Sequence, residues 1–166
     1  MLNLVLLVLG CLGVCALLVI LTYRSDQWAL GLSFATGVIC SLGLLVSLWA
    51  LLTSDASSIH MAWTLPLGSL HLALDPLSAF FLVCIFLVSA LAAFYGTGYI
   101  RAYIGHQPLA PLVFFFAVLV ISMAFVVLAR DGVLFLIAWE VMSLAAFFLV
   151  TYEDHREDVR RAGMTY

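Results

Sequence analysis

Five long apolar stretches constrain this sequence more than any other feature. Each is long enough to cross the hydrocarbon core of a bilayer as a helix, which takes about 20 mainly apolar residues. The chain is 66% apolar and only 9% charged, whereas a soluble domain is roughly half apolar and a quarter charged. We therefore predict an all-α polytopic membrane protein, a single domain over residues 1–166. The predicted spans are Leu2 to Tyr23, Trp28 to Leu52, Pro76 to Ile100, Leu109 to Ala129 and Val133 to Tyr152.

The only long link, Thr53 to Asp75, has the pattern of a β-hairpin. After a polar start, apolar residues occur at every second position from Met61 to Leu65 and again from Leu70 to Leu74. Such alternation on both sides of a turn is typical of paired strands. The turn itself, Leu65-Pro66-Leu67-Gly68, fits type I. An open sheet edge cannot satisfy its backbone groups in hydrocarbon, so we expect this hairpin outside the bilayer core.

The arginines predict the orientation of the spans. With five spans, the N-terminus, the hairpin link and the turn at Arg130 share one side, which then holds a single arginine. The opposite side holds Arg24, Arg101, Arg156, Arg160 and Arg161. Because cytoplasmic segments carry the excess of basic residues, we expect the charged tail 153–166 in the cytoplasm. The N-terminus and the hairpin are then extracytoplasmic, in the cell inner (plasma) membrane.

Glu140 is the main candidate for a functional residue. It lies near the middle of the fifth apolar stretch, where an ionisable group costs about 3 kcal/mol on insertion scales. Such residues generally mark ion or proton routes. The alternative is a protonated carboxyl that only hydrogen-bonds a neighbouring helix. Ser143 lies one turn later on the same helical face and is a possible supporting residue.

No side chain of this sequence is an obvious cationic partner for Glu140. There is no lysine, and His60, His71, His106 and His155 all lie in links or in the tail. Arg130 is ten residues upstream, about 15 Å along a helix axis. We therefore expect Glu140 to be neutral unless another chain or segment supplies a buried cation.

Other candidate sites are weaker. Asp75 precedes Pro76 and is explained by capping of the third span, although a supporting functional role stays open. The four cysteines lie inside apolar stretches without converging histidines, so we predict no metal site and no cofactor. A net charge of −3 argues against nucleic-acid binding. Nothing resembles a nucleophile-and-base pair or a phosphate loop, so we expect no catalysis by this chain alone.

Three motifs resemble one membrane-protein family. Trp139-Glu140-Val141-Met142-Ser143-Leu144 resembles the fifth helix of the antiporter-like proton-pumping subunits, which occur in respiratory complex I, multi-subunit sodium/proton antiporters and group 4 membrane-bound hydrogenases. The run from Asp75 to Phe81 resembles the start of their third helix, and the run from Arg160 to Tyr166 the lead-in to their sixth. The stretch Ala138 to Leu149 is most similar to the branch of hydrogenase-4 component B and formate hydrogenlyase subunit 3.

This resemblance implies a role in proton translocation. In the family, the glutamate that matches Glu140 is paired with a lysine on a later helix, and this sequence stops before that lysine. The expected assignment is the N-terminal part of a longer, non-redox subunit of a hydrogenase or complex I-like oxidoreductase, with other membrane subunits as partners. Two alternatives remain open: a Na+/H+ antiporter subunit of the same superfamily, and a small structural or assembly membrane protein without transport of its own.

Overall fold

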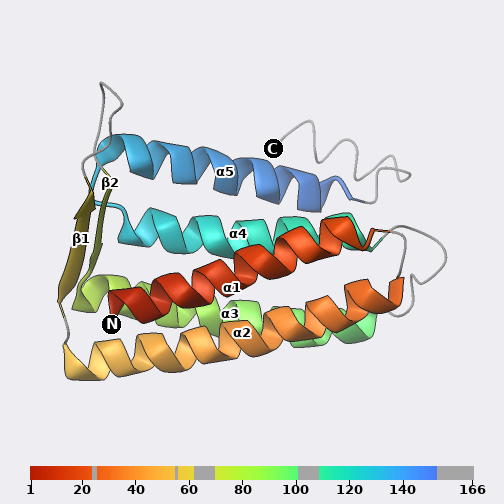
Figure 1. Ribbon diagram of the computed structural model, residues 1–166, viewed down its shortest axis with the longest axis horizontal. Coiled ribbons are helices and arrows are strands. Elements are labelled where there is room, and N and C mark those ends of the chain that lie inside the picture. The colour runs from red at the N-terminus through yellow and green to blue at the C-terminus, as the bar shows by residue number, and fades with distance from the viewer. Residues whose placement is uncertain (24–25, 55, 62–69, 101–108, 153–166) are drawn as a thin grey trace.

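The computed structural model describes residues 1–23, 26–54, 56–61, 70–100 and 109–152. It contains five helices that run side by side: α1 (Leu2–Leu21), α2 (Asp26–Thr53), α3 (Pro76–Ile100), α4 (Ala110–Leu128) and α5 (Gly132–Val150) (Figure 1). All five are long and apolar enough to cross a membrane. The predicted class, a bundle of five spans with a small β-hairpin, is confirmed.

The helix ends lie within two residues of the predicted spans, and α3 matches its span at both ends. Local hydrogen bonds form at the end of α1 and at the start of α5. After α1 ends at Leu21, the Thr22 hydroxyl donates to the Leu18 carbonyl at 2.7 Å and the chain turns. The Asp131 carboxylate accepts hydrogen bonds from the backbone N–H groups of Val133 and Leu134, which caps the first turn of α5. The short turn between α4 and α5 makes them antiparallel neighbours, as predicted.

Small residues allow α2 and α3 to approach closely. A Cβ atom on Gly43 would lie 2.8 Å from the ring of Phe86, and one on Gly37 would lie 3.0 Å from the ring of Phe94. Phe86 is fully buried. Close backbone approach at small residues is the usual way in which membrane helices gain packing energy, because lipid offers no hydrophobic driving force between them.

Helix α5 lies at one edge of the bundle and packs mainly against α4 (Figure 1). Only 17% of the residues in its most apolar stretch are buried, compared with 33–39% in the other four helices. Its buried residues are Leu134, Ala138 and Ala145. Most of the α5 surface would therefore contact lipid or another membrane protein.

The link after α2 forms two antiparallel strands, β1 (Ser57–Met61) and β2 (Leu70–Leu74). The first strand starts earlier than the alternation from Met61 to Leu65 predicts. The polar Ser57 belongs to it and pairs with Leu74 of β2. The Ser57 hydroxyl also accepts a hydrogen bond at 3.2 Å from the backbone N–H of Leu2. The predicted turn at Leu65 to Gly68 lies outside the described residues.

The hairpin is fixed to one end of the bundle (Figure 1). Leu72 and Leu74 of β2 are buried in the core. Leu72 also forms an isolated antiparallel bridge with Ala129, and the backbone N–H of Arg130 donates to the His71 carbonyl at 2.9 Å. The start of α1, the hairpin and the α4–α5 turn thus share one end, as the predicted topology requires. Which side of the membrane this end faces remains a prediction.

Candidate functional site

Glu140 lies near the middle of α5 and is exposed on the surface of the bundle. With 3.6 residues per turn, it is about 140° around the helix axis from the buried stripe of Leu134, Ala138 and Ala145. The carboxyl therefore points away from α4. Its neighbours one turn before and after are Leu136 and Leu144, both exposed and apolar. An ionisable group is thus exposed midway along an apolar helix.

No described residue is bonded to the Glu140 carboxyl. Within the described ranges, Glu140 makes neither a hydrogen bond nor an ion pair. Ser143 is half-buried on the same side of α5 and has no hydrogen bond to Glu140. The pairing of these two residues thus stays a prediction. A partner for Glu140 has to come from a residue outside the described part of the chain or from another molecule.

A groove of about 350 Å³ lies between α4 and α5, beside the exposed face of α5. Ile137 and Val141, the neighbours of Glu140 along the helix, line it together with Ala138. The α4 side contributes apolar residues and Ser122, whose hydroxyl donates to the Leu119 carbonyl. The surface next to Glu140 is therefore hollowed and apolar, a shape that suits a hydrophobic neighbour.

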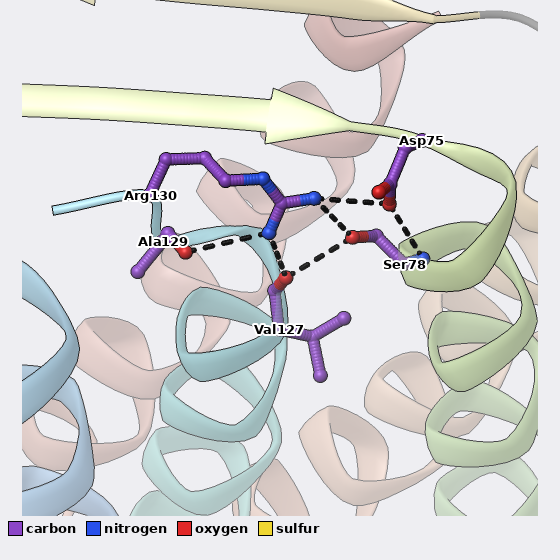
Figure 2. Close-up of polar contacts among 5 residues, drawn as sticks. All are labelled: Asp75, Ser78, Val127, Ala129 and Arg130. Carbon is purple, nitrogen blue, oxygen red and sulfur yellow. Dashed lines mark hydrogen bonds and ion pairs between the residues drawn. The ribbon is translucent and has the colours of Figure 1, made fainter.

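Asp75 lies between β2 and α3 and belongs to a polar network with Ser78 and Arg130 (Figure 2). One carboxylate oxygen, Oδ1, accepts from the backbone N–H of Ser78 at 2.8 Å, which confirms the predicted cap of α3. The same oxygen forms an ion pair with Arg130 at 2.9 Å. The structure therefore brings Asp75 together with Arg130 and does not bring it to Glu140.

Ser78 and the carbonyls at the end of α4 complete this network. The Arg130 guanidinium donates to the Ser78 hydroxyl at 2.9 Å and to the carbonyls of Val127 and Ala129 at 3.4 Å. The Ser78 hydroxyl in turn donates to the Val127 carbonyl at 3.2 Å. A buried hydroxyl and one arginine thus tie the start of α3 to the end of α4 (Figure 2).

These contacts favour the charged form of Asp75. Hydrogen bonds from Ser78 and the positive charge of Arg130 hold the pKa of the Asp75 carboxyl below its ordinary value of 3.8. Sequence reasoning found the cap and missed the ion pair, because the partners are far apart in the chain. The signal available in the sequence was the single arginine of the α4–α5 turn, Arg130.

Comparisons with known proteins agree with the resemblance in part. No protein-family model matches this chain. An uncharacterized protein of Mycobacterium tuberculosis is 38% identical over 109 residues, which is 65% of this chain and 16% of that protein. The "Putative antiporter subunit mnhA2" of Staphylococcus aureus is 27% identical over 165 residues, 98% of this chain and 20% of that protein.

A third relative represents the hydrogenase branch. The "Hydrogenase-4 component B" of Escherichia coli is 31% identical over 99 residues, which is 60% of this chain and 14% of that protein. The chain thus spans a fifth or less of the length of these relatives. These similarities support a place for this chain among the antiporter-like membrane subunits.

Proposed function

We propose that this chain is part of a membrane subunit that contributes to proton translocation coupled to electron transfer, in a group 4 hydrogenase or complex I-like complex. Glu140 is the proton-carrying side chain in this proposal. The observation that carries it is the exposed position of Glu140 at mid-span, without a described partner. A carboxyl is retained at such a depth only where a polar or charged neighbour completes its surroundings.

The exposed face of α5 supplies the place for that neighbour. Another membrane helix that packs beside α5 and the α4–α5 groove would cover Glu140 and exclude lipid from it. A cationic side chain on this helix, as the family resemblance implies, would allow the carboxyl to ionise. Proton movement then consists of protonation and deprotonation of Glu140 as the distance to the cation changes.

A Na+/H+ antiporter subunit is the second candidate. It is favoured by the similarity to mnhA2, which extends over 98% of this chain. Glu140 carries the proton in both candidates. The driving force differs, because it is electron transfer in the first and a sodium gradient in the second. Proton uptake into vesicles driven by an electron donor supports the redox assignment, whereas uptake that requires a sodium gradient supports the antiporter.

Substitution of Glu140 by glutamine tests the proposal. In vesicles that carry this chain with its native partners, Glu140→Gln should slow proton translocation by about tenfold or more, because the amide cannot release a proton. Glu140→Asp should retain part of the activity. A pH-sensitive fluorescent dye reports the rate, and the amount of assembled complex is measured on native gels.

Leu144→Gln is the matched control. It introduces the same amide on the same exposed face, one turn later, and keeps the carboxyl. Translocation should remain close to that of the wild type. Normal translocation by an assembled Glu140→Gln complex would refute the role of this carboxyl. Loss of the complex itself in Glu140→Gln, with assembly intact in Leu144→Gln, would favour the structural alternative.

A further inference from the structure

The outer face of the hairpin carries two histidines directly opposite each other. His60 of β1 is the cross-strand partner of His71 of β2, and their ring centroids are 5.3 Å apart. Both side chains lie on the face that points away from the bundle, because the alternate residues Leu72 and Leu74 are buried. His60 is exposed and His71 is half-buried. The proton-translocation proposal makes no use of this pair.

The separation of the two rings is that of two ligands on one tetrahedral metal ion. A zinc–imidazole bond is about 2.0–2.1 Å. The ring centroid lies roughly 1.15 Å behind the ligating nitrogen, so two centroids at a tetrahedral angle are about 5.2 Å apart. The distance of 5.3 Å between the His60 and His71 ring centroids agrees with this value.

The hairpin also holds the two histidines in register. Bonds to the Leu2 N–H, to Ala129 and to the Arg130 N–H fix both strands at the end of the bundle. The Arg130 guanidinium, at the same end of the bundle, is bonded to Asp75 and Ser78. A site that is held in place before binding loses less conformational freedom when the ion arrives.

We propose that His60 and His71 form a binding site for a divalent transition-metal ion such as zinc, copper or nickel. Neutral imidazole nitrogens suit these ions, whereas magnesium and calcium prefer oxygen. The described residues contain no group of three or more ligating side chains. Two histidines therefore provide half of a tetrahedral shell, and water completes it. Bound metal would join β1 to β2.

The test uses the whole chain in lipid nanodiscs, purified through a tag without histidine. Calorimetric titration with Zn²⁺ should give one ion per chain, and Cu²⁺ should bind more tightly than Zn²⁺ or Ni²⁺, while Mg²⁺ should not bind. His60→Gln and His71→Gln should each weaken binding at least about tenfold, since a lost ligand costs no less than a lost supporting contact. His106→Gln should leave binding unchanged.

A transplanted pair separates lost ligands from a disturbed hairpin. Ser58 and Ala73 are cross-strand partners on the same face, two residues along each strand. Ser58→His with Ala73→His, made in the chain that carries both glutamine substitutions, should restore Zn²⁺ binding. Unchanged affinity after His60→Gln or His71→Gln would overturn the proposal, and so would equal weakening by His106→Gln, which indicates adventitious binding only. Neither result affects the proposed role of Glu140.

Discussion

At the scale of single residues, the polar network around Asp75 and the proposed proton-carrying residue, Glu140, lie in different parts of the bundle. Asp75, Ser78 and Arg130 satisfy one another at the end of the bundle, whereas Glu140 has no partner among the described residues. A group with complete local bonding is explained by its structural role. An ionisable group within a membrane span is energetically costly, and Glu140 has no partner among the described residues. Its presence therefore requires a partner outside the described structure. This contrast is the reason for proposing a structural role for Asp75 and a functional role for Glu140.

The Asp75 network should make stability depend on pH. Because the folded pKa of Asp75 is below 3.8, its carboxylate contributes stability that is fully present above that value and is lost as the pH falls through the folded pKa. The side chain is 44% exposed, so the contribution is about 1 kcal/mol or less. Asp75→Asn should thus be less stable than the wild type near neutral pH, and the difference should shrink below 3.8.

Thermal unfolding in nanodiscs across this pH range measures the effect. Ser78→Ala removes the hydroxyl, which is the largest cause of the lowered pKa, but keeps the backbone N–H, so it should make the pH dependence shallower without abolishing it. Asp131→Asn is a useful comparison, because Asp131 caps a different helix, α5. If the stability of the wild type and of Asp75→Asn changed with pH in the same way down to acid pH, the proposed contribution of the Asp75 carboxylate would be contradicted.

At the scale of the elements, the helices were predictable and the hairpin only in part. Apolar length fixes the five helices, because only helices and closed β-barrels satisfy their backbone groups in lipid and barrel strands are about half as long. The second strand follows its alternation from Leu70 to Leu74, as predicted. The first strand includes Ser57 and Ser58, which have the composition of a polar link. Their strand conformation depends on contacts with Leu2 and with β2, which no local pattern contains.

The contact between α2 and α3 gives a prediction about packing. Alanine usually stabilises a helix relative to glycine by about 1 kcal/mol. At Gly43 the added Cβ would lie 2.8 Å from the fully buried ring of Phe86, which has no space to withdraw. Gly43→Ala should therefore be destabilised by about 1–3 kcal/mol, the usual cost of overpacking.

Gly31→Ala is the control in the same helix, since a Cβ at Gly31 meets nothing within 4 Å. It should be neutral or slightly stabilising. Unfolding of both variants by a denaturing detergent, followed by circular dichroism, gives the comparison. Equal stability of the two variants would mean that α2 and α3 pack less closely at Gly43 than the structure indicates.

At the scale of the whole molecule, the position of Glu140 around α5 was not predictable. Helix α5 is apolar on all sides, so its sequence has no polar face to indicate which residues point outward. The depth of Glu140 in the span follows from the sequence, because it depends only on counting residues. Its exposure follows from the peripheral place of α5, which is a property of the assembled bundle.

The orientation of the bundle in the membrane is the remaining prediction at this scale. The start of α1, the hairpin and the α4–α5 turn lie at one end. In the sequence these segments hold a single arginine, Arg130, whereas the other two links and the tail hold five. The uneven distribution predicts that the hairpin is outside. In a chain without its four native cysteines, a membrane-impermeant thiol reagent added to intact cells should label a cysteine at Ser58.

Ser58 suits this test because it is exposed on the outer face of the hairpin. A cysteine at Asp158, in the tail, should be spared until the membrane is permeabilised, and it then serves as the positive control for reactivity. Labelling of Asp158→Cys in intact cells, with Ser58→Cys protected, would reverse the orientation. The carboxyl of Glu140 would keep its depth in that case, but the two ends of any proton route through it would exchange sides. Proton uptake measured in vesicles would then correspond to transport across the cell membrane in the opposite direction.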